Sequence, residues 1–384
     1  MRLTIIGPVY PYRGGIAHFT ASLAHAASKK NAVQVVSFSR LYPQLLYPGK
    51  TDRDPSELAI QFPASEVIDT MNPLSWRRGA SFIAQHKSDM VVFQWWTTFL
   101  APCFIGLMKH LPSDNLQIMF LIHNVLPHEP KMMDRWLAHR VLRKADGFIV
   151  QTQREKERLL TILPDVTNQI EICPHPVYDS FSPIQITKQE ARSRLNLPVD
   201  LPILLFFGFI REYKGVKQLL ESLAILRDQG EEVFALLAGE IWDGKEGYFK
   251  KVADLGLEKL VRFDNRYIPN EDVPLYFSAA DLFAAPYTQG TQSGSVRIAL
   301  HFGLPIVATD RITYGLEEAG SDVLISVPAD NPEAFAHGIS EMLGRSPGDD
   351  KVKDAGGGLT DWDDLADSIK DLYIKIQHIP ETSS

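Results

Sequence analysis

The chain has 384 residues, of which 45% are hydrophobic and 22% are charged, so it is long enough for two or three domains with large buried cores. Its 39 basic and 47 acidic residues give a net charge of −8, which argues against a nucleic-acid partner. No apolar run approaches the roughly 20 residues that cross a bilayer, and the N-terminal run is too short for a signal peptide. Cys103 and Cys173 form no metal or disulfide spacing, which predicts two buried thiols in a reducing cytoplasm.

The start of the chain predicts a strand, a glycine-containing loop and a helix. Leu3–Ile6 is apolar and of strand length, and the apolar residues from Ile16 to Ala27 have helical spacing. The loop between them lacks the G-x-G-x-x-G pattern of dinucleotide-binding proteins. Its pair Gly14 and Gly15 would let a ligand approach the backbone closely, or forms only a turn.

The next stretch contains two adjacent tryptophans at the end of a predicted strand. Val33–Phe38 predicts the second strand, and residues 40–80, rich in proline, tyrosine and polar side chains, are expected to be irregular. Met90–Gln94 predicts a strand that is followed by Trp95 and Trp96. These tryptophans either contact an apolar or sugar ligand or pack in the core, and the sequence favours neither.

A histidine directly follows the next predicted strand, Gln117–Ile122. Ligands of parallel α/β sheets bind beyond the carboxyl ends of the strands, so His123 is placed to contact a ligand hydroxyl. A structural role is the alternative. A strand at Asp146–Val150 and a helix at Gln153–Leu163 follow.

The helix expected at Met132–Lys144 is unusually basic. It carries Arg135, Arg140, Arg143 and Lys144. Such a run of charges is usually a solvated face, and peripheral contact with anionic lipid is the alternative.

Composition predicts three parts of the chain. Residues 174–202 are rich in proline and indicate a connection between domains, with a short helix at Lys188–Leu195. We therefore expect domains at 1–175 and 176–360. In residues 361–384, the helical apolar stripe of Trp362–Ile376 predicts a terminal helix that packs back on the first domain.

The second domain opens with a strand, a cationic loop and a helix. Ile203–Phe207 is a continuous apolar run, the loop Gly208–Gly215 holds Arg211 and Lys214, and helical spacing begins at Val216. This layout presents backbone N–H groups, a helix N-terminus and two cations to an anion. A plain strand–helix unit with solvated charges is the alternative.

Strand and helix patterns alternate through the rest of this domain. The expected strands are Val233–Leu237, Val261–Phe263, Leu282–Ala285 and Ile306–Ala308, and the expected helices are Tyr248–Leu255, Glu271–Ala279 and Ser295–Phe302. Alternation in both halves predicts an α/β protein with two doubly wound, Rossmann-like domains that face a cleft.

These segments together resemble glycosyltransferase family 4, the group 1 transferases with the two-domain GT-B fold, over nearly the whole chain. The matching pieces are GPVYPYRGGIAHFT at the start, HNVLPHE at 123–129, FFGFIREYKGVKQLLESL at 206–223, LLAGE at 236–240, AADLFAAPYTQGTQSGSVRIALHFGLPIVATD at 279–310 and the closing tryptophan helix. The resemblance implies a cytoplasmic, retaining enzyme that moves a sugar from a nucleotide-diphosphate sugar to a hydroxyl of a glycan or lipid-linked acceptor. It implies no cofactor and no bound metal.

The resemblance also assigns roles to residues of this chain. His123, Arg211 and Lys214 would be catalytic: His123 would orient the donor sugar, and the two cations would stabilise the leaving diphosphate. The donor-binding candidates are Gly14, Gly15, Gly208, Glu240, Tyr267, Ile268, Gln292, Ser293, Gly294 and Ser295. The acceptor-binding candidates are Arg13, Trp95 and Trp96.

The chain departs from the family pattern at two places. Many members have Gly-Arg where this chain has Gly208-Phe209, and Arg211 is the expected replacement. The glutamate pair of the E-x7-E motif falls on Gly290 and Ile298, so the usual ribose contact is missing. A non-catalytic nucleotide-sugar-binding module and an epimerase on the same fold are the alternatives. Donor sugar, base, acceptor and linkage are not predicted.

Overall fold

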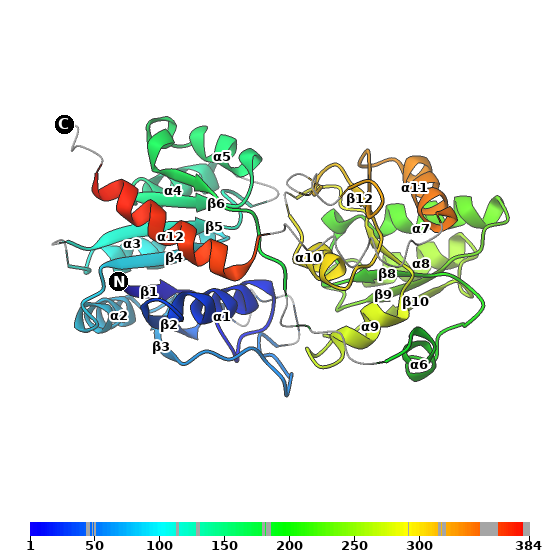
Figure 1. Ribbon diagram of the computed structural model, residues 1–384, viewed down its shortest axis with the longest axis horizontal. Helices are drawn as coiled ribbons and strands as arrows, with labels where there is room; N and C mark the ends of the chain where they lie inside the picture. The colour runs from blue at the N-terminus through cyan, green and yellow to red at the C-terminus, as the bar shows by residue number, and fades with distance from the viewer. Residues whose placement is uncertain are drawn as a thin grey trace. The chain divides into compact units, whose positions relative to one another are not determined.

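The computed structural model describes residues 1–43, 47, 49, 51–112, 115–127, 131–178, 181, 186–290, 292–313, 316, 320–345 and 360–378. The chain divides into two compact units (Figure 1). Unit 1 consists of Met1–Asp54, Ala59–Pro174 and Thr360–Ser384, and unit 2 consists of Pro55–Leu58 and His175–Leu359.

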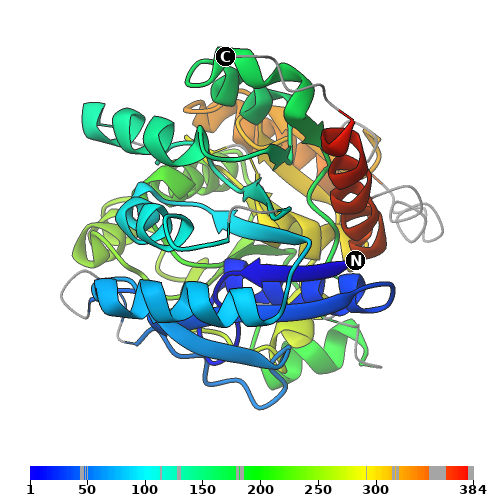
Figure 2. The same cartoon turned by 90° about the vertical axis from the view of Figure 1, so that its left-hand side faces the viewer.

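Unit 1 forms, over its described residues, a seven-stranded parallel sheet in the order β3-β2-β1-β4-β5-β6-β7. The strands are β1 (Arg2–Ile6), β2 (Ala32–Arg40), β3 (Ala64–Asp69), β4 (Met90–Trp95), β5 (Gln117–Ile122), β6 (Gly147–Val150) and β7 (Ile170–Ile172). The helices are α1 (Gly15–Ser28), α2 (Pro73–Gln85), α3 (Ala101–Met108), α4 (Met132–Leu142) and α5 (Gln153–Leu160), with the 3₁₀ turns η2 (Thr98–Leu100) and η3 (Pro164–Gln169). Every residue of β4 is buried, as expected for a parallel sheet with helices on both faces (Figures 1 and 2).

The expectation that residues 40–80 are irregular is wrong. The strand β3 and the first half of α2 lie within this stretch. β3 is a half-buried edge strand with charged residues, so it lacks a continuous apolar run. α2 begins where the side chain of Asn72 accepts a hydrogen bond from Leu74 N and Pro73 occupies the first turn, a start signal that the proline-rich composition concealed.

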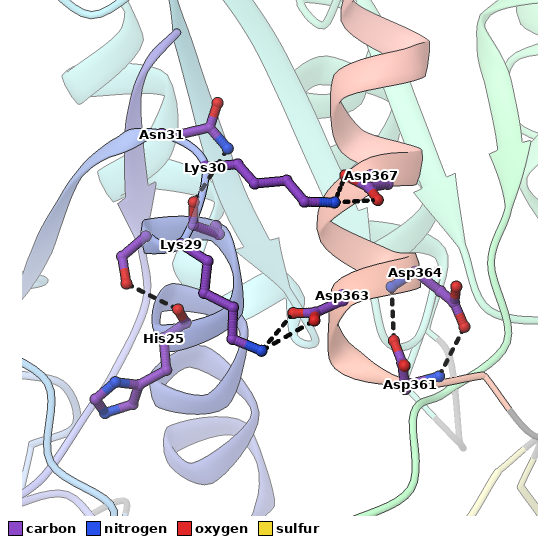
Figure 3. A network of polar contacts seen from close by, with 10 residues as sticks. His25, Lys29, Lys30, Asn31, Asp361, Asp363, Asp364 and Asp367 are labelled. Atoms are coloured by element: carbon purple, nitrogen blue, oxygen red, sulfur yellow. Dashed lines mark hydrogen bonds and ion pairs between the residues drawn. The ribbon is translucent and has the colours of Figure 1, made fainter.

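The terminal helix α12 (Trp362–Gln377) is part of unit 1 and packs on α1 and β6. The ring of Trp362 meets Phe19 edge-on at 5.0 Å, and a Cβ at Gly147 would lie 2.3 Å from the Ile376 side chain, so the glycine leaves room for the helix. At the solvent edge, Lys29 and Lys30 reach Asp363 and Asp367 at 2.8 and 2.7 Å (Figure 3). Because these ion pairs are exposed, the apolar contacts supply most of the attachment.

Unit 2 forms, over its described residues, a six-stranded parallel sheet in the order β10-β9-β8-β11-β12-β13. The strands are β8 (Ile203–Phe207), β9 (Phe234–Ala238), β10 (Val261–Asp264), β11 (Leu282–Ala285), β12 (Ile306–Thr309) and β13 (Leu324–Val327). The helices are α6 (Lys188–Arg194), α7 (Val216–Asp228), α8 (Lys245–Asp254), α9 (Val273–Ala279), α10 (Gly294–His301) and α11 (Pro332–Gly344), with the 3₁₀ turn η4 (Glu212–Lys214).

The predicted fold class, α/β with two Rossmann-like domains, is confirmed by these two sheets. The predicted cleft concerns the placement of the units relative to each other and stays a prediction. Within the described ranges, none of the helices has the length and the apolar character needed to cross a membrane.

Candidate functional site

The loops at the carboxyl ends of β8, β9 and β11 approach one another so closely that glycine is required. Gly215 has φ +70°, and a Cβ there would lie 1.8 Å from the carbonyl oxygen of Pro286. Gly239 has φ +145°, and a Cβ there would lie 2.1 Å from the carbonyl oxygen of Gly208. Side chains at either position would push the loops apart, so the glycines fix the position of the cationic loop.

Lys214 lies in this loop with its ammonium beside the backbone of Gly208. Its Nζ is 3.1 Å from where a Cβ of Gly208 would stand, and 5.2 Å from the ring centroid of Tyr287. Burial acts to lower the pKa of the ammonium, but Tyr287 and Tyr213 outweigh it and raise the pKa above its ordinary value. In the part of the chain that the structure describes, Lys214 forms no ion pair with a carboxylate. Its charge is therefore available to an anion.

Tyr287 connects Lys214 to the start of α10. Its hydroxyl lies 3.0 Å from Ser293 Oγ and 3.4 Å from Ser295 Oγ, and the two serine oxygens are 2.9 Å apart. Ser293 is also the N-cap of the helix and accepts a hydrogen bond from Val296 N. Burial acts to raise the pKa of Tyr287, but the Lys214 charge and the hydrogen bonds lower it overall. We call Lys214, Tyr287, Ser293 and Ser295 the anion cluster.

Gln292 and Gly294 flank the N-cap of α10. Both polar atoms of the Gln292 amide are buried and have no hydrogen-bond partner among the described residues. A Cβ at Gly294 would lie 3.3 Å from the buried ring of Tyr178, so this glycine lets the helix start pack closely. An unsatisfied amide is costly to bury, which makes Gln292 a candidate for a ligand contact.

An aromatic cluster, Phe209, Trp242 and Tyr267, lies beyond the ends of β8, β9 and β10. The ring of Phe209 is 4.2 Å from that of Trp242 and 6.2 Å from that of Tyr267. Arg211 is exposed, and its guanidinium lies over the Trp242 ring at 5.7 Å. Arg211 thus belongs to the same loop as Lys214, and its guanidinium lies at the aromatic cluster.

Two further donor-binding candidates, Glu240 and Ile268, follow β9 and β10 in the chain. Glu240 is buried, and its carboxylate accepts a hydrogen bond from Trp242 Nε1 at 3.3 Å. The side chain of Ile268 is buried. Phe209, Trp242 and Tyr287 were not among the sequence candidates, although each is an aromatic residue within a few positions of a strand end.

The glutamate positions of the family motif hold no acid in the structure. Gly290 has φ +138°, and a Cβ there would lie 3.1 Å from the Ile312 side chain. Ile298 is buried in α10. Gly290 and Ile298 therefore contact other parts of the protein.

In unit 1, His123 is held by groups from two elements, β4 and α1. Its Nε2 lies 2.6 Å from Gln94 Oε1 of β4, and its backbone N–H donates to the Trp95 carbonyl at 2.8 Å. Its ring meets Phe19 of α1 edge-on at 4.6 Å, and only 8% of the residue is exposed. The imidazole therefore has one orientation, set before any ligand arrives.

The glycine loop after β1 has one position where a side chain would clash with its neighbours and one where it would not. A Cβ at Gly7 would lie 2.7 Å from both Gln94 and Thr20, so this position requires glycine. Gly14 has φ +102° and precedes α1 as its N-cap. A Cβ at Gly15 would meet no atom within 4 Å.

The two tryptophans after β4 have different environments. Trp95 is fully buried, donates its indole N–H to the Val125 carbonyl at 3.2 Å and packs in the core, so its assignment as an acceptor-binding residue is wrong. Trp96 is partly exposed and donates to Tyr42 Oη at 2.9 Å. Arg13 donates to Tyr47 Oη at 3.0 Å, and the rings of Tyr42 and Tyr47 are 6.1 Å apart. Arg13 and Trp96 are thus linked through the two tyrosines.

Comparison with known proteins first defines the class through the fold. Sucrose-phosphate synthase from Thermosynechococcus elongatus aligns over 98% of this chain and 99% of its own, with a TM-score of 0.72 and 18% identity. Anabaena Alr3699/HepE in complex with UDP-glucose aligns over 100% and 99%, with a TM-score of 0.68 and 17% identity. The fold is the two-domain GT-B fold of glycosyltransferases.

Sequence comparison finds a likeness to one family over part of the chain. Residues 201–345 match the family model of glycosyl transferases group 1. The chain is 25% identical over 236 residues to D-inositol 3-phosphate glycosyltransferase from Corynebacterium aurimucosum, which covers 59% of this chain and 55% of that protein. The chain spans about half the length of the curated relatives it matches. The resemblance to group 1 glycosyltransferases is confirmed.

Proposed function

We propose that this chain transfers a sugar from a nucleotide-diphosphate sugar to an acceptor hydroxyl, with retention, in glycan, polysaccharide or glycolipid biosynthesis. The observation that carries the proposal is the anion cluster. It combines an ammonium without a carboxylate partner among the described residues, two serine hydroxyls and the N-terminus of α10. Such a set stabilises a diphosphate through charge, hydrogen bonds and the helix dipole.

The donor would lie along the carboxyl ends of β8 to β11. Its diphosphate would contact Lys214, Ser293 and Ser295, and Gln292 would use its free amide on a phosphate or sugar oxygen. The base would stack near Phe209, Trp242 and Tyr267. Proteins of the same fold in complex with UDP and with UDP-glucose support a nucleotide donor.

The chemistry requires positive charge at the leaving group. The bond between the anomeric carbon and the diphosphate oxygen breaks, the acceptor oxygen bonds to that carbon from the same face, and the departing phosphate takes the acceptor proton. Lys214 would offset the charge that develops on the diphosphate, and this interaction strengthens in the transition state. His123 would hold a donor sugar hydroxyl, with Gly14 and Gly15 allowing close approach.

The acceptor and the cellular location are finer parts of the proposal. Arg13 and Trp96, linked through Tyr42 and Tyr47, would contact a glycan or lipid-linked acceptor, since aromatic and cationic groups suit sugars and phosphates. The buried thiols of Cys103 and Cys173 are free, which supports a reducing compartment such as the cytoplasm.

Thermal unfolding of the purified chain with nucleotide ligands tests the proposal. We expect nucleoside diphosphates and one class of nucleotide-diphosphate sugar to raise the unfolding temperature, and monophosphates to raise it less, because the anion cluster binds the diphosphate. The donor that binds is then incubated with candidate acceptors. Transfer of the sugar supports an enzyme. Binding without transfer or hydrolysis would instead support a nucleotide-sugar-binding module, the alternative that Gly290 and Ile298 favour.

A further inference from the structure

Tyr287 is a buried tyrosine whose backbone and ring are both held in place. The residue is 3% exposed, and its carbonyl accepts a hydrogen bond from Thr309 Oγ1 of β12 at 2.5 Å. Its ring meets that of Tyr213, in η4, edge-on at 6.2 Å. The next residue, Thr288, donates its backbone N–H to the Tyr213 carbonyl at 2.8 Å. The phenol hydroxyl therefore has a defined position between η4 and the start of α10.

The hydrogen bond between Lys214 and Tyr287 has only one possible direction. The side chains of these two residues are hydrogen-bonded to each other. An ammonium has three N–H donors and no acceptor, so the Tyr287 oxygen accepts and its own proton is left to donate. The shorter of the two serine contacts of this hydroxyl is to Ser293 Oγ at 3.0 Å, and the longer is to Ser295 Oγ at 3.4 Å. The phenol therefore donates to Ser293.

Ser293 continues this direction to Ser295. Its Oγ accepts the Tyr287 proton and, as the N-cap of α10, the backbone N–H of Val296 at 3.5 Å. Because both acceptor positions are then occupied, its own proton is donated, and Ser295 Oγ lies 2.9 Å away. Over the described residues, Ser295 Oγ has no hydrogen-bond partner besides these two hydroxyls. Since the Tyr287 oxygen already accepts from Lys214, the Ser295 proton is left for a ligand.

We propose that Tyr287 is a positioning residue that directs the Ser295 hydroxyl to the diphosphate of the donor. We call the directed order Lys214, Tyr287, Ser293, Ser295 the hydrogen-bond relay, in which each bond polarises the next. The ammonium keeps two N–H groups for the diphosphate, so the anion would receive donors from both ends of the relay. Of the two serines, Ser295 then has the proton to give. This inference rests on the proposed function, because it specifies how the anion cluster holds its ligand.

Steady-state kinetics of two single variants and their combination test the relay. Tyr287→Phe keeps the ring and removes the hydroxyl. It should lower kcat about fivefold with KM little changed, because the charge on the diphosphate grows in the transition state. Ser295→Ala removes the terminal donor and should lower kcat about tenfold. In the double variant the loss should stay at about tenfold, rather than the roughly fiftyfold of independent residues, since Tyr287 acts through Ser295.

A conservative variant and a matched control separate the relay from a purely structural effect. Ser295→Thr keeps a hydroxyl at the end of the relay and should retain most of the turnover. Tyr248→Phe is the control for the loss of a buried phenol, because Tyr248 is 1% exposed on α8 of the same unit and lies outside the anion cluster. It should turn over as the unmodified chain does. Circular dichroism establishes that each variant is folded.

Binding of inorganic pyrophosphate, measured by calorimetry, separates the relay from the transfer reaction, since it needs neither donor sugar nor acceptor. Tyr287→Phe and Ser295→Ala should each lower the affinity about threefold, again without adding in the double variant. This pattern without sugar transfer would contradict the proposed function and support the relay. Sugar transfer with unchanged kcat in Tyr287→Phe, or with additive losses in the double variant, would support the proposed function and overturn the relay. Absence of pyrophosphate binding by the unmodified chain would also overturn it.

Discussion

The two units begin with the same strand, glycine loop and helix, yet the polar groups beside the two loops are used differently. Beside the loop of unit 1, His123 lies against Gln94, and His18 lies 3.3 Å from the buried carboxylate of Asp54. Beside the loop of unit 2, the ammonium of Lys214 contacts a glycine backbone and aromatic rings. The first loop orients hydrogen-bonded groups, and the second presents positive charge.

This difference indicates a division of roles within one repeated architecture. A paired imidazole is suited to position a hydroxyl, because its orientation is fixed and its contribution is a single hydrogen bond. An ammonium without a carboxylate partner in the described chain is suited to a diphosphate, because a charged donor makes a strong hydrogen bond to a phosphate oxygen. Substitutions in and beside the two loops test this difference.

The largest effect is expected from the glycine that brings the second loop against β11. Gly215→Ala places a Cβ 1.8 Å from the Pro286 carbonyl oxygen, at a φ of +70°, so the loop must move. We expect a loss of about 2–4 kcal/mol in the free energy of unfolding, together with a loss of donor affinity. Chemical denaturation measures the first and thermal shift the second.

Gly230→Ala is the control for this change. Gly230 also has a positive φ, +85°, but a Cβ there meets no atom within 4 Å. Gly230→Ala should lower the free energy of unfolding by only about 1 kcal/mol, which is the cost of placing alanine in a left-handed backbone conformation. Equal losses for the two variants would show that the contact with Pro286 is unimportant.

The next effect is catalytic. Lys214→Ala should lower turnover by about 10- to 100-fold, because hydrogen bonds to charged groups contribute roughly 1.5–3 kcal/mol and this one strengthens as charge develops on the leaving group. Lys217→Ala is the matched control, since Lys217 lies one residue into α7 and pairs with the exposed Glu212 at 3.1 Å. Steady-state kinetics should show the loss of turnover in Lys214→Ala and not in Lys217→Ala. Unchanged turnover in a folded Lys214→Ala enzyme would mean that the anion cluster has no part in the mechanism.

Stability should fall in mild acid because of His175 at the start of unit 2. Burial lowers the pKa of its imidazole to about 3, with a further contribution from the charge of Arg297. Between pH 6.5 and 3 the unfolded chain therefore binds a proton that the folded chain does not. Stability is lost as the pH falls through this window, by at most about 1.4 kcal/mol per pH unit.

The comparison of pH slopes isolates this residue. His175→Gln removes the titrating group, so denaturation between pH 7 and pH 5 should show a smaller loss of stability than in the unmodified chain. His175 and Tyr178 are packed together, with rings 5.3 Å apart, and Tyr178 lies against Gly294 at the start of α10. Parallel slopes for the two proteins would mean that His175 is accessible to protons in the folded state.

A smaller effect is expected from His123→Ala. Loss of one neutral hydrogen bond corresponds to about 0.5–1.5 kcal/mol, so turnover should fall by about three- to tenfold while affinity for the free nucleoside diphosphate is unchanged. His110→Ala, at an exposed position after α3, is the control. A fall in diphosphate affinity equal to that in turnover would make His123 a structural residue and remove the contrast between the loops.

Continuous apolar runs predicted strands well, and edge or polar segments did not. β5, β8 and β11 have the predicted bounds because parallel strands that are mostly buried are apolar at nearly every position. β3 was missed because it is a half-buried edge strand. Trp95 and Trp96 illustrate a second limit: Trp95 ends β4 and Trp96 follows the strand, and the sequence does not say which of these two neighbouring side chains is covered.

Candidate site residues could be proposed from the sequence where the loop itself carried the signal. Lys214 and Ser293 are such candidates, because a cation in a glycine loop and a serine before a helix are local patterns. Tyr287 was not a candidate, because its place in the anion cluster depends on its contact with Lys214, which is distant in sequence. The placement of Arg211 also depends on a distant residue, Trp242.

The smallest effect is expected from Arg211→Ala, and it decides how the second loop replaces the family arginine. The guanidinium is exposed and lies over Tyr213 and Trp242 at 5.4 and 5.7 Å, whereas the ammonium of Lys214 lies on Gly208. A contact of this kind contributes about 0.5–1 kcal/mol at an exposed position, so we expect a two- to fivefold loss, seen mainly in donor affinity.

Kinetics of the double variant with Lys214→Ala complete this test. If Arg211 acts at the aromatic cluster, the two losses should add on a free-energy scale, because each variant removes a separate contact. A tenfold or larger loss of turnover in Arg211→Ala, with strong non-additivity, would place the guanidinium on the leaving diphosphate together with Lys214. The charge of the second loop would then come from two side chains rather than one, and its contrast with the loop of unit 1 would be greater still.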